Sequence, residues 1–382
     1  MVLGILGRTP FAGVAWQMLH YLEGLRRLGF DVFYVEDTGE WPYDAARNTI
    51  TDDAGYTTRY IARMMASIEM ADRWAYRSAV DDSVLGPQAD RIPQLFGSAD
   101  ALINLTGSTV LRSEHLQVPV RIYLETDPVL PQIEIAQQNQ HTIDLLAAHT
   151  HHLTFGENLG APDCQVPVGR FAYRATRQPI VLDWWNGPPA ESPPAAPFTT
   201  ISNWKQSGKD VEWQGEVYFW SKHHEFLRFL DVPSRSAEAF ELALACNDAN
   251  ALSLLTRHGW QVRNALELSR EIGPYRDYVR GSRGEFTVAK DQNIRLRSGW
   301  FSDRSACYLA AGRPVITQET GFTNILPTGK GLYGFTTLDD ILGALDSIAV
   351  NYAGHCEAAA DIAVEYFAAE IVLGRLCDQV GL

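Results

Sequence analysis

The sequence predicts an α/β protein with two doubly wound, Rossmann-like domains that face each other across a cleft. Three observations lead to this prediction: the length of the chain, a strand–helix–strand pattern at its start, and a proline-rich segment near its middle. At 382 residues the chain is longer than one hydrophobic core usually supports. Hydrophobic residues make up 46% of it and charged residues 20%, which are ordinary values for globular proteins. The composition therefore allows two full cores.

The chain begins with a βαβ pattern. Residues 2–6 form a short apolar run typical of a buried strand, and the turn-rich sequence GRTPFAG follows. An amphipathic helix is expected next, ending at Gly29, and strand character returns at 31–36. The helix is indicated by apolar residues at helical spacing, namely Met18, Leu22 and Leu25. This order implies a parallel sheet covered by helices.

Three more strands are expected in the first half, and each ends in small or polar residues. The strands are 101–105, 120–124 and 152–155, and the sequences TGS, ETDP and GEN follow them. The segment 56–76 has a helical pattern. Because ligands of open α/β sheets bind at the carboxyl ends of strands, these loops are expected to line a site.

The clearest domain boundary is the sequence GPPAESPPAAP at 187–197, in which five of eleven residues are proline. Such a segment favours an extended spacer. The predicted domains are therefore 1–186 and 198–382. The second domain again alternates strands with helices, and its expected strands are 198–202, 241–246, 260–262, 285–289 and 314–317. Helices are expected from Leu338 onward, and the last one is expected to cross back onto the first domain.

Charge and cysteine content limit the class of partner and the compartment. The formal net charge of −14 argues against nucleic acid or an anionic membrane as the principal partner, since both reward clustered Lys and Arg. The five cysteines are widely spaced and form no CxxC pair, which favours a reducing, cytoplasmic location. No run approaches the roughly 18–20 apolar residues that cross a bilayer, so no membrane span is expected.

A segment of the second domain, 284–322, combines clustered positive charge with a helix start. Ser302 is the expected N-cap of a helix that runs through Ala311 and stops at Gly312, so free backbone N–H groups would lie at its start. Phosphate groups bind at such positions. The alternative is that Ser302 only caps the helix and the arginines form surface ion pairs. The cationic side chains of the segment are Lys290, Arg295, Arg297 and Arg304.

Two stretches resemble glycosyltransferases of the GT-B type. The sequence LAAGRPVITQETG is similar to their A-x-G-x-P-V helix–turn–strand element, with matches at Ala310, Gly312, Pro314 and Val315. The N-terminal GILGRTPFAGVAWQMLHYLEGLRRLGFDVFYVED resembles bacterial glycosyltransferase-like proteins that begin with a Gly loop and an L-x-x-L-G-H-x-V turn. The resemblance covers nearly the whole chain. It implies GT-B architecture, with the donor on the second domain and the acceptor on the first.

One departure from the family pattern limits what the resemblance implies. Retaining GT-B enzymes of the commonest type carry two glutamates eight residues apart before the A-x-G-x-P-V element. Gly299 and Cys307 stand at those two positions here. The resemblance therefore supports a nucleotide-sugar fold more strongly than that family's sugar chemistry, and the stereochemical outcome stays open.

The resemblance also implies the residues of the site. Lys290 and Arg295 are the expected catalytic cations, which would stabilise the departing nucleoside diphosphate in place of a metal ion. The other expected donor-binding residues are Lys209, Arg297, Ser298, Gly299, Phe301, Ser302, Asp303, Arg304, Thr320 and Gly321. The expected acceptor-binding residues lie in loops after predicted strands: Gly7, Gly13, Thr106 and Gly107.

Asp127 is a candidate catalytic base or ligand of an acceptor hydroxyl, because it follows the predicted strand at 120–124. An Asp-Pro pair is equally typical of a turn, so both interpretations stay open. Glu125 is close enough in sequence to share the site. Trp204 and Trp300 are candidates for stacking on a base or sugar, although core packing explains a tryptophan as well.

No metal ion or cofactor is expected. His149, His151 and His152 are clustered, but adjacent residues of an extended segment point to opposite faces. The predicted function is metal-independent glycosyl transfer from a nucleotide-diphosphate sugar to a small-molecule or saccharide acceptor. The alternatives are a nucleotide-sugar epimerase of the same architecture and a non-catalytic nucleotide or carbohydrate binder. The sugar, the nucleotide and the oligomeric state are left open.

Overall fold

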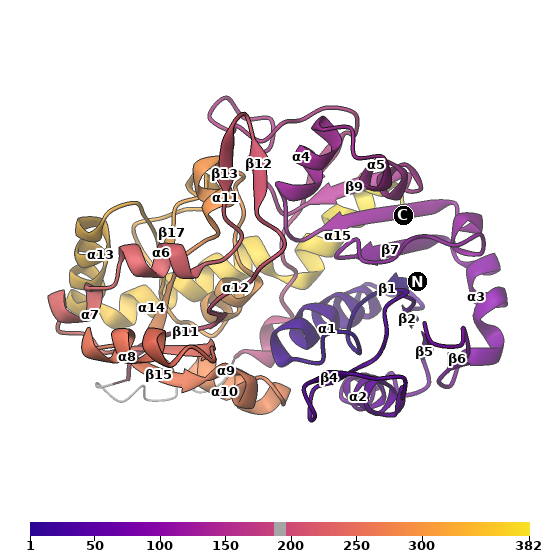
Figure 1. Cartoon of the computed structure of the whole chain (residues 1–382), viewed down its shortest axis with the longest axis horizontal. Coiled ribbons are helices and arrows are strands. Elements are labelled where there is room, and N and C mark those ends of the chain that lie inside the picture. Colours follow the sequence, from indigo (N-terminus) through magenta and orange to yellow (C-terminus); the bar gives the residue numbers. More distant parts are fainter. Residues whose placement is uncertain (187–195) are drawn as a thin grey trace.

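The computed structural model describes residues 1–186 and 196–382. Each half of the chain holds one large sheet, and the halves lie side by side (Figure 1). The predicted α/β class with two doubly wound sheets is confirmed. Most of the predicted spacer at 187–197 falls outside the described residues.

The first sheet has eight strands in the order β10-β9-β8-β7-β1-β2-β5-β6. All neighbouring pairs are parallel except β5 and β6. The strands are β1 Val2–Leu3, β2 Tyr34–Glu36, β5 Trp74–Arg77, β6 Val84–Leu85, β7 Ala101–Leu105, β8 Val120–Glu125, β9 His151–Thr154 and β10 Tyr173–Ala175. The helices are α1 Ala12–Arg27, α2 Gly55–Ala66, α3 Ile92–Ser98, α4 Leu130–Ala136 and α5 Gln140–Ala147, and a separate hairpin pairs β3 Tyr43–Asp44 with β4 Thr49–Ile50.

Two predicted elements of this half were too long. The strand expected at 2–6 ends at Leu3 because the backbone N–H of Leu6 donates to the Tyr34 hydroxyl, 2.9 Å away, and not to a neighbouring strand. The helix expected at 56–76 ends at Ala66, and Trp74 begins the buried strand β5 beside β2. In both cases a contact distant in sequence overrides a locally apolar pattern.

The second sheet has six parallel strands in the order β15-β14-β11-β16-β17-β18. They are β11 Phe198–Asn203, β14 Phe240–Ala245, β15 Gln261–Asn264, β16 Gly284–Thr287, β17 Val315–Gln318 and β18 Leu332–Phe335. The first five agree with the predicted strands within two residues, and β18 was not predicted. The helices are α6 His223–Arg228, α7 Val232–Arg235, α8 Ala249–Arg257, α9 Ala265–Leu268, α10 Ile272–Gly281, α11 Asp291–Arg295, α12 Asp303–Ala310, α13 Leu338–Val350, α14 Tyr352–Ile362 and α15 Ala369–Val380. No helix in the described ranges is long and apolar enough to span a membrane.

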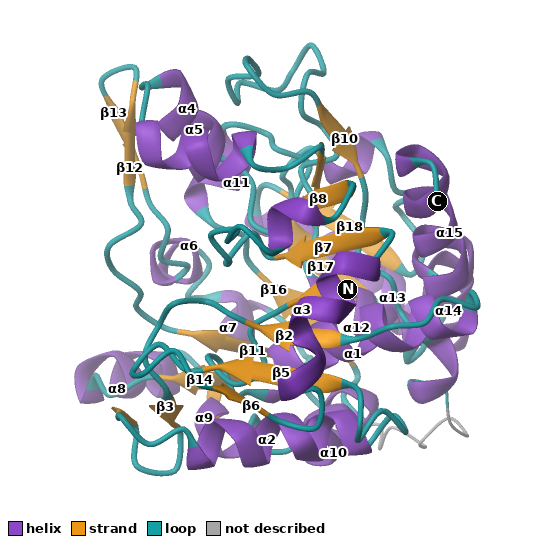
Figure 2. Ribbon diagram, turned by 90° about the vertical axis from the view of Figure 1, so that its right-hand side faces the viewer, coloured by secondary structure: helices purple, strands orange, loops and turns teal. Residues whose placement is uncertain are grey.

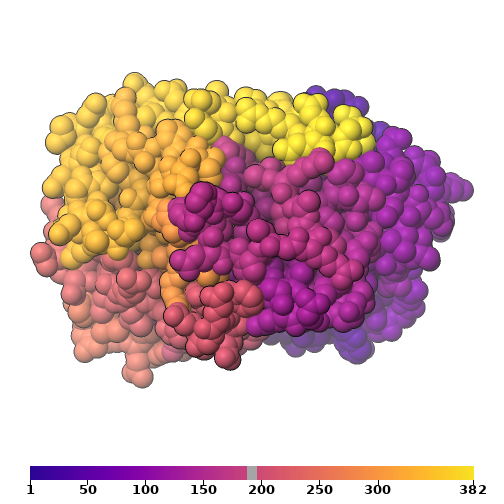
Figure 3. Space-filling view, turned by 90° about the horizontal axis from the view of Figure 1, so that it is seen from above, coloured from indigo at the N-terminus to yellow at the C-terminus, as the bar shows by residue number. Residues whose placement is uncertain are grey.

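The last helix crosses back onto the first half, as expected. Figure 3 shows the C-terminal segment, in yellow, running over both halves on one face of the molecule. Its helix α15 packs on α1, where a Cβ atom on Gly24 would lie 2.5 Å from Leu373. Just before α15, the backbone N–H of Ile180 donates to the carbonyl of Phe367, 2.7 Å away. The C-terminal segment therefore fixes one half against the other.

A second contact between the halves is built on Asn158, which follows β9. Its backbone N–H donates to the Ser298 carbonyl at 3.1 Å, and its side-chain amide donates to the Arg297 carbonyl at 2.9 Å. Gly299 lies directly against it, since a Cβ there would be 2.3 Å from the Asn158 backbone nitrogen. The Arg297 guanidinium also pairs with Asp163 at 2.8 Å. We call these residues the Asn158 clasp.

The hairpin of β12 Val211–Trp213 and β13 Glu216–Tyr218 extends this contact. It leaves the second half and reaches α4 of the first, and Figure 2 shows the two elements at the same end of the molecule. The Gln137 side chain donates to the carbonyl of Glu212 at 2.7 Å. The two halves are thus held together by the C-terminal segment, the Asn158 clasp and this hairpin.

The clasp requires glycine at position 299. Gly299→Ala is expected to lower the free energy of unfolding by about 3 kcal/mol, because alanine there is strained at φ +80° and also collides with Asn158. Gly329→Ala is the matched control, since Gly329 has φ +94° and a Cβ added there would meet no atom within 4 Å. It should lose only about 1–2 kcal/mol. Equal losses in urea unfolding of the two variants would contradict this account of the clasp.

Candidate active site

A cavity of about 630 Å³ lies between the two sheets. Its walls are loops that follow the carboxyl ends of strands from both halves, as expected for open α/β sheets. From the first half come residues after β1, β7 and β8, including Arg8, Gly13, Thr106, Ser108 and Asp127. From the second half come Ser202, Lys209, Lys222, Ala265, Lys290, Trp300, Ser302, Asp303 and Arg304.

Two helices begin at the cavity wall. Helix α1 starts after Phe11, and helix α12 starts after Ser302, as predicted. Neither N-cap side chain makes a capping hydrogen bond, although the first backbone N–H of α1, that of Ala12, donates to the Ser269 carbonyl at 2.7 Å. Helix N-termini carry partial positive charge and favour anions. The starts of α1 and α12 therefore contribute positive partial charge to the cavity wall.

Lys290 contributes a buried ammonium group to the cavity. Lys290 is 7% exposed, and its Nζ lies 3.2 Å from the centroid of the Trp220 ring. The same Nζ forms an ion pair with Asp127 across the cleft. Burial lowers the pKa of Lys290, and the neighbouring Asp127 raises it again in part. Lys209 approaches the same tryptophan ring at 4.7 Å.

Lys222 is a second buried ammonium group, and it has no acidic partner. The residue is 8% exposed, and its Nζ lies 5.1 Å from the centroid of the Trp300 ring. Within residues 1–186 and 196–382, this Nζ makes no hydrogen bond or ion pair. Burial lowers its pKa well below the usual value. The positive charges of Arg304 and Lys290 add to this effect, and the nearby carboxylates of Glu285 and Asp127 offset it only in part. A buried cation without a partner is costly, so this position is suited to an anionic ligand.

Two carboxylates face the same cavity in different environments. Asp127 is bound to Lys290 and its side chain remains 44% exposed. Burial raises the pKa of Asp303 to about 7, even though the Gln17 side chain from α1 donates to it at 3.0 Å. Two carboxylates at one cavity suit proton transfer or recognition of sugar hydroxyls.

Arg304 reaches the cavity wall and also makes hydrogen bonds within the protein. Its guanidinium pairs with Glu285 and donates to the Ile201 carbonyl at 2.6 Å and to Thr287 at 2.9 Å. These contacts tie α12 to the ends of β11 and β16. Arg304 therefore fixes the helix start at the cavity and adds its charge there.

Several residues that the sequence predicted for the site lie elsewhere. Arg295 pairs with Glu216 and donates to the Val217 carbonyl at 2.9 Å, so it supports the β12–β13 hairpin outside the cavity. Phe301 is buried and packs on Phe322 and Phe367. The remaining donor-site residues absent from the lining belong to the Asn158 clasp or its support: Arg297, Ser298, Gly299, Thr320 and Gly321.

Two predicted acceptor residues also have structural roles. The backbone N–H groups of Gly7 and Arg8 donate to the buried carboxylate of Glu36, at 2.7 and 2.6 Å. Burial raises the pKa of Glu36 to about 7. A Cβ on Gly107 would lie 2.3 Å from the Tyr123 ring, so this glycine permits close packing. Of the four predicted acceptor residues, Gly13 and Thr106 line the cavity.

Glu125, the other acid considered beside Asp127, faces away from the cavity lining. Its carboxylate accepts hydrogen bonds from the Gln132 amide at 2.8 and 2.9 Å and from the Thr154 hydroxyl at 2.6 Å. Burial raises its pKa to about 8. Gln132 in turn accepts from the backbone N–H of Val129, which has a positive φ of 95°. Glu125 thus braces the strained turn that presents Asp127.

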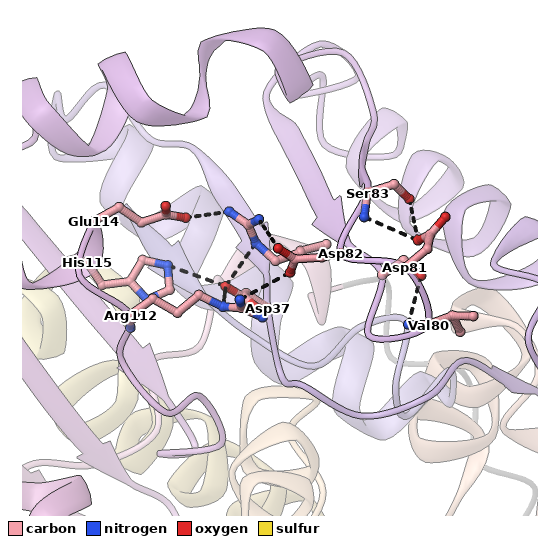
Figure 4. A network of polar contacts seen from close by, with 10 residues as sticks. Asp37, Val80, Asp81, Asp82, Ser83, Arg112, Glu114 and His115 are labelled. Carbon is pink, nitrogen blue, oxygen red and sulfur yellow. Dashed lines mark hydrogen bonds and ion pairs between the residues drawn. The ribbon is translucent and has the colours of Figure 1, made fainter.

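The histidine cluster does not converge on a common point. His149 contacts Asn104 and the Leu145 carbonyl, while His152 contacts the Leu146 carbonyl. Another group, Asp37, Glu114 and His115, brings possible ligand atoms together at the end of β2. Figure 4 shows guanidinium groups among these carboxylates, and Arg112 pairs with Asp37 at 2.9 Å. Such cations already neutralise the carboxylates and would repel a metal ion.

Lys222 and Gln17 were missed by the sequence analysis. Lys222 lies in the sequence WSKHHEF, where the neighbouring histidines gave the only visible signal, and a lone lysine is usually a surface residue. Gln17 is one polar residue on an amphipathic helix. Their placement depends on contacts between the halves, which no local pattern encodes.

Comparisons with known proteins concern the fold. No protein-family model matches the chain, and no curated protein matches its sequence. Solved structures do match over its whole length. An alpha-glucosyltransferase in complex with UDP and a 13-mer DNA containing a HMU base has a TM-score of 0.60 at 8% identity, covering 100% of this chain and 98% of that one. HepE from Anabaena in complex with UDP-glucose has a TM-score of 0.60 at 10% identity, with the same coverage.

The chain has the GT-B fold. A third structure of this kind is AviGT4, a glycosyltransferase involved in Avilamycin A biosynthesis, with a TM-score of 0.52 at 13% identity over 99% of this chain and 96% of that one. The GT-B resemblance seen in the sequence is therefore confirmed at the level of the fold. The cavity described above lies between the two sheets of this fold.

Removing the unpaired buried charge should stabilise the protein. Lys222→Met is expected to raise the free energy of unfolding at pH 7 by about 1–3 kcal/mol without ligand, because it replaces a costly buried cation by an apolar chain of similar length. Folding lowers the pKa of Lys222, so below the usual lysine value of 10.5 the unfolded chain binds this proton more tightly than the folded protein. The free energy of unfolding of the wild type therefore rises as the pH approaches 10.5. The advantage of the variant over the wild type should shrink over the same range. Urea unfolding at several pH values measures both effects.

The matched control is Lys205→Met. Lys205 is an exposed lysine that pairs with Asp248, and its replacement should change stability by less than about 0.5 kcal/mol. Destabilisation by Lys222→Met would mean that the ammonium has a partner within the folded chain.

Proposed function

We propose that this protein is a glycosyltransferase that moves a sugar from a nucleotide-diphosphate donor to a small-molecule or saccharide acceptor without a metal ion. The observation that carries the proposal is the unpaired, buried ammonium of Lys222 beside Lys290, in the interdomain cavity of a GT-B fold. Support comes from the structures that share this fold, since the alpha-glucosyltransferase binds UDP and HepE binds UDP-glucose.

The diphosphate is the part of the donor that matches the cations. Lys222 and Lys290 supply two positive charges, and the start of α12 supplies backbone N–H groups. Negative charge grows on the diphosphate as the glycosidic bond breaks, and preorganised cations in a cavity stabilise that charge most effectively. These groups replace the metal ion that would otherwise neutralise the leaving group. Activity is therefore proposed to persist in the presence of EDTA.

The acceptor is proposed to enter from the side of the first half. Thr106, Ser108 and Asp127 line that wall, and hydroxyl and carboxylate groups suit the recognition of an acceptor hydroxyl. Asp127 is the proposed base. The net charge of −14 favours a neutral saccharide or small molecule over a polyanion. Because one structure of similar fold contains DNA, an acceptor screen should include nucleic acid as well.

An epimerase would use the same cavity, and Asp127 with Asp303 offers it two acid–base groups. Product analysis separates the two activities. A transferase joins the sugar to the acceptor and releases a nucleoside diphosphate, whereas an epimerase returns an isomeric nucleotide sugar. We favour the transferase because two lysine cations in the cavity suit stabilisation of a nucleoside diphosphate that is released, which an epimerase need not release permanently.

Nucleotide binding tests the proposal. Thermal shift with UDP, GDP, TDP, ADP and their sugars should show stabilisation by one nucleotide family, because a ligand that binds only the folded state raises the melting temperature. Lys222→Ala and Lys290→Ala should each weaken binding by about 10- to 100-fold, the value of a charged contact. Lys205→Ala, an exposed lysine outside the cavity, should bind like wild type. No shift with any nucleotide at millimolar concentration would rule the proposal out.

A further inference from the structure

The ion pair between Lys290 and Asp127 joins the two halves across the cavity. Asp127 belongs to the first half and Lys290 to the second, and the charged atoms of both lie at the cavity wall. The pair therefore occupies the region where donor and acceptor would meet. Among the described residues, the Asp127 carboxylate is the only acidic group that forms an ion pair with Lys290.

The two partners differ in how firmly they are held. The Lys290 side chain is 8% exposed and its Nζ rests on the Trp220 ring, so the ammonium has little freedom to move. The Asp127 side chain is 44% exposed. If a stronger anion approaches Lys290, the carboxylate is the partner that can turn away.

The backbone of Asp127, in contrast, is fixed. The turn that follows it is braced by the contacts of Glu125, Gln132 and Val129, and the Trp300 ring N–H donates to the Thr126 carbonyl at 3.0 Å. Rotation of the Asp127 side chain therefore needs no movement of the chain. The carboxylate would stay in the cavity after it leaves Lys290.

We propose that this ion pair is exchanged during the reaction: the donor diphosphate displaces Asp127 from Lys290, and the freed carboxylate then accepts the proton of the acceptor hydroxyl. The inference rests on the proposed function and adds an order of events to it, in which donor binding precedes activation of the acceptor. Before the donor binds, the Asp127 carboxylate is held by the Lys290 ammonium and is not available to the acceptor hydroxyl. The donor must therefore bind before the acceptor can be activated.

The substrates and these side chains account for every bond and proton in the transfer step. The acceptor oxygen forms a bond to the anomeric carbon of the sugar, while the bond from that carbon to the diphosphate oxygen breaks. The electron pair of the broken bond leaves with the nucleoside diphosphate, close to Lys222 and Lys290. The proton of the acceptor hydroxyl moves to a carboxylate oxygen of Asp127.

If the ion pair is exchanged, substitutions of its two partners should change the affinity for UDP in opposite directions, as measured by calorimetry. Asp127→Asn should bind UDP about 3- to 10-fold more tightly than wild type, because the competing carboxylate is gone. Lys290→Met should bind it about 10-fold or more weakly. With a turning-over donor and acceptor, Asp127→Asn should lower kcat by about 10²- to 10⁴-fold, the value of general base catalysis.

Asp163→Asn is the matched control, because it removes another ion pair between the halves, that with Arg297, outside the cavity. Its UDP affinity should equal that of wild type. Weaker or unchanged UDP binding by Asp127→Asn, or equal tightening by Asp163→Asn, would overturn the exchange while the proposed function stands. Failure of wild type to bind any of UDP, GDP, TDP and ADP would overturn both.

Discussion

The buried ammonium groups of Lys222 and Lys290 are the constraint around which the cleft is organised. Burying an amine lowers its pKa and costs free energy unless an anion is close. Among the described residues, only Lys290 forms a direct ion pair with such an anion, and that anion comes from the other half of the molecule. A negatively charged ligand in the complete site would offset the free-energy cost of burying these two ammonium groups.

The rest of the cleft supports the same requirement. The carboxyl ends of both parallel sheets meet there, which places loops and two helix N-termini around one cavity. The tryptophan rings of Trp220 and Trp300 hold the ammonium groups without neutralising them. The Asn158 clasp and the crossing helix α15 keep the halves close enough for their charges to interact. Positioning of the cations is thus a property of the whole fold.

The fold was largely predictable from the sequence, because strand and helix patterns are local. The Ala310–Val315 element and the N-terminal βαβ unit identified the architecture, and Ser302 marked the start of α12. The site was predictable only in part. Asp127, Lys290, Lys209, Ser302, Asp303 and Arg304 line the cavity as expected, and Gly13 and Thr106 do so as well. Their roles in binding and catalysis remain proposals.

The predicted site residues that lie outside the cavity, and the lining residues that were not predicted, have a common physical explanation. Arg295 follows Lys290 by five residues, but a short helix turns its side chain towards Glu216 and away from the cavity. The glycines at 299 and 321 were expected to bind the donor, yet they make room for Asn158 from the other half. Lys222 was overlooked because nothing in its local sequence distinguishes it from a surface lysine. Side-chain direction and contacts between halves depend on tertiary packing, which spacing along the chain does not report.

The most direct test of the central claim is a crystal structure of the protein with the nucleoside diphosphate that stabilises it most. The account predicts the diphosphate in the interdomain cavity, with its oxygens within hydrogen-bond distance of Lys222 Nζ and Lys290 Nζ and near the start of α12. A nucleotide bound elsewhere, or one whose diphosphate leaves Lys222 without a partner, would contradict it.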